Sequence, residues 1–399
     1  LIMLLIMKKI IVIHTKYRIT GGEDIAVDSE VATLKRYFNV ETLYFSNNKT
    51  EKLFKQIISF FRNKNQNANK ILIDKLNSFN PDLVYVHNTW FKPSLGIFKV
   101  LENKGVKHFL KLHNYRFDCG RHFTKSAHLK NQEKCKACGM KSSSNIIFNK
   151  YFQESYLKSL ILIRFSKKYF KLLKNIKIIT LTEFQRKYLI DLGVKSENIN
   201  TLINPISILE SKIDDFDLSI KKNNYIIYAG LISEEKGVDS LISTYNLLVD
   251  FKKKLVIAGE GPLLAELKNK YKDNQKIIFT GKLANEEVLY LIKNSYSTIT
   301  NTCLYEGQPT LLSEASKLEK NSIYPISGGI QEFFPEGNPF AFKANNEIDL
   351  LKKLKLLRHE DIVIDQAQKN KKFIEEKLKE DNYINIFREI VEWIIKIWV

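Results

Sequence analysis

Cysteine is rare in this sequence. Only four cysteines occur in 399 residues, and the N-terminus lacks the order of a secretory signal, because Lys8 and Lys9 follow the apolar run 1–7 instead of preceding it. The sequence therefore predicts a cytoplasmic protein with reduced thiols. Met7 is the expected start of the native chain, with the residues before it an upstream extension.

Long apolar stretches are also missing. The run 1–7 is too short to span a bilayer, and it continues into a β-branched stretch typical of a buried strand. No repeat of solenoid period occurs. A composition of 44% apolar and 27% charged residues excludes collagenous and wholly disordered classes. At 399 residues the chain exceeds the usual size of a single core, which predicts two domains.

Acidic residues are few compared with basic ones. Asp and Glu number 44 against 63 Lys and Arg, giving a formal net charge of +19. Such a charge favours an anionic partner, which could be nucleic acid, an anionic membrane surface or a phosphorylated small molecule. Composition does not choose among these, and a Lys-rich, Asn-rich habit of the source genome explains the charge equally well.

Short β-branched runs alternate with amphipathic stretches in both halves of the chain, which is typical of βαβ units and parallel sheets. The expected strands are 8–14, 41–45, 82–88, 107–114, 176–182, 224–230, 253–259, 275–281, 295–300 and 321–325. The polar segment 208–223 lacks an apolar period and is interpreted as an interdomain linker, with the boundary near Pro205. The sequence thus predicts an α/β protein of two parallel-sheet domains.

Open parallel sheets bind ligands beyond the carboxyl ends of their strands. Most of the Gly-rich and His-bearing turns fall at such positions, and two such domains facing each other would place these loops in a shared cleft. The candidate loops follow His14, His87, His113, Gly230, Gly259, Gly281 and Thr300.

Two glutamates flank an expected helix start at Pro309, a position that suits proline because its missing N–H costs nothing there. Glu306 precedes the helix, and Glu314 lies about 7.5 Å along its axis. The pair is therefore too spread out to flank one scissile bond. It could grip an elongated ligand with a phosphate between the carboxylates, or it could be two solvated carboxylates beside a turn.

The segment YEGQPTLLSEASKLEKNSIYPISGGIQEFF (305–334) resembles the signature of the retaining glycosyltransferases of family four, the group 1 glycosyltransferases. Other segments are similar to the same family, and within it to a subgroup that carries GGED and HNYR elements. These segments are HTKYRITGGEDIAVDSEVATLKR (14–36), LVYVHNTW (83–90), LHNYRFDCG (112–120), LTEFQRKYLIDLGV (181–194), YAGLISEEKGVDSLI (228–242), VIAGEGPLLAEL (256–267) and IIFTGKLANEEV (277–288).

The resemblance implies the GT-B fold, with two Rossmann-like domains facing a central cleft. It predicts an acceptor-binding domain over 1–205, a nucleotide-sugar-binding domain over 206–380, and a final helix over 381–399 that crosses back onto the first domain. The implied reaction transfers a sugar from a nucleoside diphosphate sugar to a hydroxyl acceptor with retention of configuration. A glycan or lipid-linked glycan of cell-surface polysaccharide synthesis is the expected acceptor.

For the donor site, the resemblance implies that Glu314 holds the ribose hydroxyls, that Glu306 lies by the donor sugar, and that Lys236 neutralises the leaving diphosphate. The family usually has an Arg where this chain has Leu231, so the sequence predicts weaker phosphate binding or replacement by Lys282. The other residues assigned to donor binding are Gly307, Gln308, Thr310, Gly21, Gly22, Gly259 and Gly261.

His113 follows an apolar strand, and the resemblance assigns it to contact with the reacting sugar; His87 has the same placement with weaker support. Retaining members of the family need no dedicated protein base and no divalent ion, so the acid–base role of His113 stays open. A cysteine-rich loop follows. It could hold a structural zinc or carry free thiols, and its candidate ligands are Cys119, Cys135 and Cys138, with His122 and His128 nearby.

The run 149–175 mixes apolar and aromatic residues with Lys and Arg. It is either a core helix with a solvated basic face or a patch that contacts anionic lipid on the inner face of the cell membrane. Two other functions stay open. One is a sugar-nucleotide epimerase or hydrolase on the same fold. The other is a zinc-stabilised nucleic-acid-binding protein, which is disfavoured because no compact motif of a nucleic-acid module occurs.

Overall fold

The computed structural model describes residues 7–17, 21–46, 59, 61–90, 92–115, 117, 156–206 and 221–397. The chain divides into two compact units. In the described parts of the chain, the first unit contains the residues up to 206 together with 380–397, and the second contains 221–379. The predicted linker lies outside the described residues over 208–220, as does the whole cysteine-rich loop.

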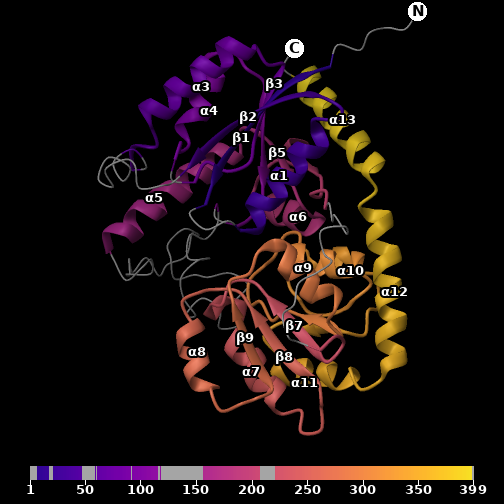
Figure 1. Ribbon diagram of the computed structural model, residues 1–399. Coiled ribbons are helices and arrows are strands. Elements are labelled where there is room, and N and C mark those ends of the chain that lie inside the picture. The colour runs from indigo at the N-terminus through magenta and orange to yellow at the C-terminus, as the bar shows by residue number, and fades with distance from the viewer. Residues whose placement is uncertain are drawn as a thin grey trace, which may run out of the picture. The chain divides into compact units, whose positions relative to one another are not determined.

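The first unit is built on a six-stranded sheet with the order β2-β1-β3-β4-β5-β6, in which all strand pairs are parallel. Figure 1 shows strands of this sheet with helices around them. Its strands are β1 Lys9–Lys16, β2 Asn39–Ser46, β3 Leu83–Val86, β4 His108–Leu112, β5 Lys177–Thr180 and β6 Ile199–Thr201. The central strands β3 and β4 are buried along their whole length, as expected for a parallel sheet covered on both faces. β3 is wholly apolar, whereas β4 also buries His108 and Lys111.

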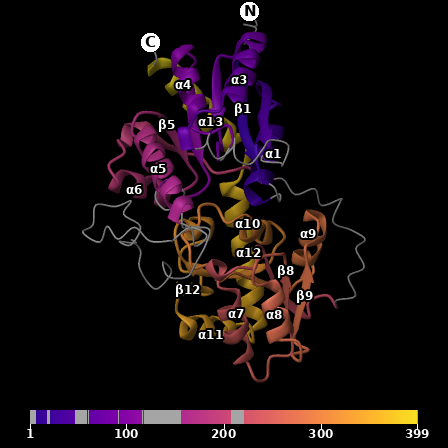
Figure 2. The same cartoon turned by 90° about the vertical axis from the view of Figure 1, so that its left-hand side faces the viewer.

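Helices cover the first sheet. They are α1 Gly22–Leu34, α3 Gln66–Phe79, α4 Gly96–Asn103, α5 Tyr156–Leu173, α6 Glu183–Asp191 and α13 Glu380–Ile397. One core cluster joins α1 and α13 to the sheet, with Val27, Tyr85 and Phe387 among its members. Figure 2 shows α13 beside the strands of this unit. The last helix of the chain therefore completes the core of the first unit.

The second unit has a six-stranded parallel sheet with the order β12-β11-β10-β7-β8-β9. Its strands are β7 Tyr225–Ala229, β8 Lys254–Ala258, β9 Ile277–Gly281, β10 Ser297–Ile299, β11 Asn321–Ile326 and β12 Ala341–Lys343. Its helices are α7 Val238–Asn246, α8 Leu264–Lys270, α9 Asn285–Lys293, α10 Thr310–Lys317, α11 Glu347–Leu356 and α12 Glu360–Lys377, with the short 3-10 helices η5 Glu234–Lys236 and η6 Ile330–Phe333.

Two buried clusters lie on the two faces of the second sheet. One gathers Ile226, Ile257 and Leu354 with their neighbours, and the other gathers Ile227, Val256 and Ile292. Alternate residues of β7 and β8 thus point to opposite faces of the sheet, and the side chains on both faces are buried. The predicted fold class, α/β with two Rossmann-like parallel sheets, is confirmed. Among the described helices, none is both long and apolar enough to cross a membrane.

Candidate functional site

The carboxyl edge of the second sheet is closed by backbone hydrogen bonds between successive loops. The N–H of Gly230 donates to Ala258 O at 2.9 Å, and the N–H of Gly259 donates to Gly281 O at 2.8 Å. These bonds join the loops after β7, β8 and β9 into one rim. Lys282, which follows β9 and is exposed, therefore stands on the same rim as Leu231, whose side chain is 50% exposed.

Close packing of this rim explains two of its glycines. A Cβ atom on Gly259, whose φ is +138°, would lie 1.9 Å from Gly230 O, and one on Gly261 would lie 2.1 Å from Ile232 O. Both distances are far inside van der Waals contact. The fold itself therefore requires glycine at 259 and 261, without reference to a donor.

Lys236 and Glu306 meet at the same edge although 70 positions separate them in the sequence. Lys236 ends η5, and the chain turns there at Gly237, whose φ is +61° and whose missing side chain leaves room for Asn301 O. The Lys236 ammonium donates to Glu306 Oε1, and the Thr302 hydroxyl donates to the same oxygen at 3.0 Å. Both charged side chains are partly exposed.

The loop that carries Glu306 lies directly against the glycine turn after β11. Glu306 and Gly328 form a parallel β-bridge, and the N–H of Gly329 donates to Glu306 O at 2.8 Å. Gly328 has a φ of +62°, and a Cβ atom there would lie 2.5 Å from Glu306 O. The contact between the two loops explains why the second one contains glycine, and it fixes the backbone of Glu306.

Glu314 is a buried carboxylate. Helix α10 begins at Thr310, with Pro309 directly before it, and Glu314 is only 8% exposed. Burial raises the pKa of Glu314 to about 7. In the described part of the chain, no side chain forms an ion pair or a hydrogen bond with this carboxylate. An unpaired buried acid is costly to keep, so Glu314 is not a solvated surface residue, and its position favours a ligand-binding role.

Three of the other residues predicted for the donor site, Gly307, Gln308 and Thr310, lie between these two glutamates in the sequence. Gly307 is buried, and Gln308 and Thr310 are half-buried, where the loop enters α10. The structure thus brings Glu306, Lys236 and the start of α10 together at the carboxyl edge of the second sheet, the place where open parallel sheets bind ligands.

At the carboxyl edge of the first sheet, Gly21 precedes α1 and Gly22 is its first residue. A Cβ atom on Gly21 would meet no described residue within 4 Å. Asp24 in the first turn accepts a hydrogen bond from the N–H of Gly21 at 3.1 Å and lies 2.7 Å from His14 Nε2. Burial acts to raise the pKa of Asp24, but hydrogen bonds from His14 and Gly21 outweigh it, and the pKa is lowered.

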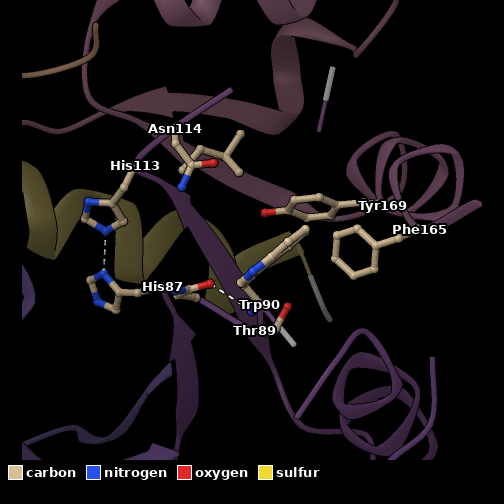
Figure 3. A pocket seen from close by; sticks show the side chains of 9 residues that line it. His87, Thr89, Trp90, His113, Asn114, Phe165 and Tyr169 are labelled. Atoms are coloured by element: carbon tan, nitrogen blue, oxygen red, sulfur yellow. Dashed lines mark hydrogen bonds between the residues drawn. The ribbon is translucent and has the colours of Figure 1, made fainter. Parts of the chain in front are cut away.

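His87 and His113 follow neighbouring strands and are joined by a hydrogen bond of 2.9 Å between His87 Nδ1 and His113 Nε2 (Figure 3). Burial holds the pKa of both imidazoles well below the usual value, and the Lys111 ammonium nearby adds to the effect, so both rings are neutral. Both line a small pocket. Its other lining residues are Asn88, Thr89, Trp90, Leu112, Asn114, Phe165 and Tyr169.

Sequence reasoning missed a charged network directly beneath this pair. The Lys111 ammonium donates to both oxygens of Glu30, at 2.9 and 3.0 Å, and both side chains are fully buried. The hydroxyls of Tyr85 and Tyr383 also donate to Glu30 Oε1, at 2.8 and 2.6 Å. A lysine within an apolar strand was the available signal, but its partner lies 81 positions away.

Among the residues that the structure describes, no group of three or more His, Cys, Asp and Glu side chains could hold a metal ion. The predicted zinc ligands of the cysteine-rich loop lie outside the described residues. Cys303, which is described, is a free thiol.

Comparison with known families gives the second unit an identity. Residues 210–379 match the family model described as glycosyl transferases group 1. The second unit carries a group 1 glycosyltransferase domain. This glycosyltransferase domain contains Lys236, Glu306, Glu314 and the glycine turn at Gly328. No curated protein matches the sequence.

Solved structures resemble the whole chain at low sequence identity. Sucrose-phosphate synthase from Thermosynechococcus elongatus is 12% identical with a TM-score of 0.69, covering 96% of this chain and 99% of its own. Anabaena Alr3699/HepE in complex with UDP-glucose is 13% identical with the same TM-score and coverage. The lipopolysaccharide outer core galactosyltransferase WaaB is 16% identical with a TM-score of 0.62, again covering 96% and 99%. These likenesses show the GT-B glycosyltransferase fold, as predicted.

Proposed function

We propose that the protein transfers a sugar from a nucleoside diphosphate sugar to a hydroxyl acceptor with retention of anomeric configuration. The observation that carries this proposal is the constellation at the edge of the second sheet. There the Lys236 ammonium contacts Glu306, and the loop of Glu306 leads into a helix that bears the buried Glu314, whose carboxylate has no partner among the described residues.

The nucleotide half of the donor suits α10. Glu314 would accept hydrogen bonds from the two ribose hydroxyls, which would give its buried carboxylate the partners that the described protein residues do not supply. The backbone N–H groups of Gly307, Gln308 and Thr310 stand at the positive end of the helix, where a phosphate is favoured. The loop that carries Glu306 runs directly into the helix that carries Glu314. This supports the hypothesis that the two glutamates bind the two ends of one elongated donor.

The chemical step needs a cation at the leaving group. Transfer breaks the bond between the sugar C1 and a phosphate oxygen, and the acceptor oxygen bonds to C1 on the same face. The acceptor's proton passes to the departing phosphate, so no protein base is required. Lys236 would stabilise the charge that develops on the diphosphate, while Glu306 would hold Lys236 and lie by the sugar.

The first unit would bind the acceptor, and His113 would contact the reacting sugar. A glycan or lipid-linked acceptor of cell-surface polysaccharide synthesis agrees with the exposed face of α5. Leu157 and Leu160 are 66% and 49% exposed at its start, and helical spacing continues this face with the exposed Arg164, Lys167, Lys168 and Lys171. Such a face suits peripheral contact with anionic lipid.

Donor binding tests the proposal directly. Titration calorimetry with UDP-, GDP- and ADP-sugars should show binding of one nucleotide class, and Glu314→Ala should abolish it. Transfer with the anomeric configuration retained, read by NMR of the product, would follow with a suitable acceptor. Turnover of the donor without any acceptor would instead indicate an epimerase or hydrolase. Salt-dependent nucleic-acid binding that survived loss of Glu306 and Glu314 would contradict the proposal.

A further inference from the structure

The hydrogen bond between His87 and His113 limits which ring nitrogen of each histidine can carry the proton. Both rings are neutral, so each bears one N–H, and their shared hydrogen bond needs one donor and one acceptor. Two arrangements satisfy this requirement. Either His87 Nδ1–H donates to His113 Nε2, or His113 Nε2–H donates to His87 Nδ1.

Burial at the far side of His87 distinguishes the two arrangements. His87 Nε2 is buried, and no described residue forms a hydrogen bond with it. If His113 donated, the proton of His87 would sit on this orphaned nitrogen. A buried N–H without a partner is rarer in proteins than a buried acceptor without one. The arrangement in which His87 donates leaves only a lone pair at Nε2, which is the less costly choice.

The charge beneath the pair favours the same arrangement. His87 Nδ1 lies 4.0 Å from Glu30 Oε2, so a proton on Nδ1 faces a carboxylate. Glu30 itself is held by the Lys111 ammonium and by two tyrosine hydroxyls, so it cannot swing away without breaking those bonds. Placing the proton of His87 on Nδ1 is therefore favoured both by Glu30 and by the burial of Nε2.

We infer that His87 is a positioning residue that locks His113 as the Nδ1–H tautomer, so that His113 offers substrate a hydrogen-bond donor and not a base. His113 Nε2 is occupied as an acceptor, and Nδ1 has no partner among the described residues of this half-buried ring. In Figure 3 the two rings lie on one side of the pocket, across from Trp90, Phe165 and Tyr169. The N–H of His113 suits a hydroxyl oxygen of the reacting sugar.

The tautomer can be read in the resting protein. Labelling the seven histidines with 15N allows two-bond couplings to report which nitrogen of each ring carries the proton. At pH 7 we expect both His87 and His113 in the Nδ1–H form, which is the minor form of free histidine in water. Resonances are assigned with His87→Asn and His113→Asn. A proton on Nε2 of His113, or a charged imidazolium at pH 7, would overturn the inference.

Two variants at position 87 supply a matched pair. The amide nitrogen of Asn reaches about as far as Nδ1 of His, so His87→Asn can still donate to His113 Nε2. The amide of Gln reaches further, toward the place of Nε2, so His87→Gln loses this donor. We expect transfer activity within about threefold of wild type for Asn, and a fall in kcat/KM of about tenfold to a hundredfold for Gln. Equal activity of both variants would refute the positioning role.

The tautomer of His113 does not depend on the proposed function. Only the hydrogen bond from His113 to a sugar hydroxyl rests on it, because that hydroxyl belongs to the proposed substrate. The NMR experiment needs no substrate, so it can fail or succeed whatever the calorimetry shows. Comparing the pH profiles of wild type and His113→Asn adds a kinetic check, because Glu314 also titrates near pH 7. If His113 is a donor and not a base, the two profiles of kcat/KM should share their ionisations between pH 6 and 8, whereas an ionisation lost in His113→Asn would contradict the inference.

Discussion

The Lys111 ammonium lies 2.9 Å from Glu30 Oε1 and 3.0 Å from Glu30 Oε2, and both side chains are completely buried. This ion pair joins β4 to α1, and the Tyr383 hydroxyl ties α13 to the same carboxylate at 2.6 Å. Helix α13 is thus attached to Glu30, the carboxylate next to His87.

Removing the carboxylate should therefore be costly. Glu30→Gln leaves the Lys111 ammonium buried without its counter-charge, and we expect a loss of about 3–5 kcal/mol in the free energy of unfolding. Tyr383→Phe removes one hydrogen bond and should cost about 1 kcal/mol. Urea denaturation measures both. The double variant Glu30→Leu with Lys111→Met should recover much of the loss, and no difference between it and Glu30→Gln would show that the unpaired charge is not the cause.

Lys236 should matter for turnover more than for folding, because it is partly exposed. Lys236→Met removes the cation proposed to face the leaving diphosphate, and we expect kcat to fall by about a hundredfold to a thousandfold. Steady-state kinetics with the identified donor measures this effect. Lys272→Met, at an exposed lysine elsewhere in the same unit, is the control and should leave kcat unchanged. A full rate in Lys236→Met would remove this residue from the mechanism.

The buried carboxylate of Glu314 should make stability depend on pH. Its folded pKa of about 7 lies above the ordinary 4.5, so the folded state holds the proton longer than the unfolded state. The contribution of protonated Glu314 to the free energy of unfolding is complete below pH 4.5, and it is lost as the pH rises to about 7. Glu314→Gln escapes this loss, and at pH 8 we expect it to exceed wild type by on the order of 3 kcal/mol. Denaturation at pH 5 and pH 8 tests the sign, since the advantage must shrink at pH 5.

Donor affinity should also depend on the ionisation of Glu314, but it should increase with pH, whereas folding stability decreases. Only the ionised Glu314 accepts hydrogen bonds on both oxygens, so binding of the nucleoside diphosphate should strengthen as pH rises through 7. Calorimetry in two buffers of different ionisation enthalpy should also detect proton release on binding at pH 6.5. Affinity that does not change between pH 6 and 8 would argue against the ribose assignment.

The glycines divide into two groups that substitution can separate. Gly259→Ala would place a Cβ atom 1.9 Å from Gly230 O, so we expect a protein that fails to fold stably. The Cβ atom of Gly21→Ala meets no described residue within 4 Å, and the φ of −120° suits any residue, so this variant should stay within about 0.5 kcal/mol of wild type. Thermal unfolding compares the two variants. If Gly21→Ala is stable but loses donor or acceptor binding, the space beside Gly21 belongs to a ligand; unchanged activity would make Gly21 only a turn residue.

Leu231 offers a test by gain of function. Its side chain is 50% exposed, so Arg can replace it without disturbing the core. If the rim binds the donor diphosphate, Leu231→Arg should tighten donor binding by about fivefold at low salt, and the gain should shrink as salt is raised. Leu231→Gln is the uncharged control. An equal gain in both variants would mean that charge is not responsible.

Of the twelve strands in the described part of the chain, the sequence predicted ten and missed β6 Ile199–Thr201 and β12 Ala341–Lys343. Both missed strands have three residues and lie at sheet edges. Three residues carry too little periodicity to separate a strand from a loop. β10 Ser297–Ile299 is equally short, but it lies inside the longer run 295–300 that the sequence predicts to be a strand. Pairing with a neighbouring strand, which only the assembled sheet provides, makes β6 and β12 strands.

The candidate site also has features that the sequence predicted and features that depend on the assembled fold. Strand ends, glycine turns and the spacing of Glu306 and Glu314 are local features, so the sequence alone identified the loops that meet at each sheet edge. Burial is not local: Glu314 and Gly259 owe their environment to segments that fold around them. The sequence therefore determined the two parallel sheets and their functional edges. Only tertiary packing decided that Lys236 meets Glu306, that Lys111 meets Glu30 and that His87 meets His113, because each pair joins distant positions.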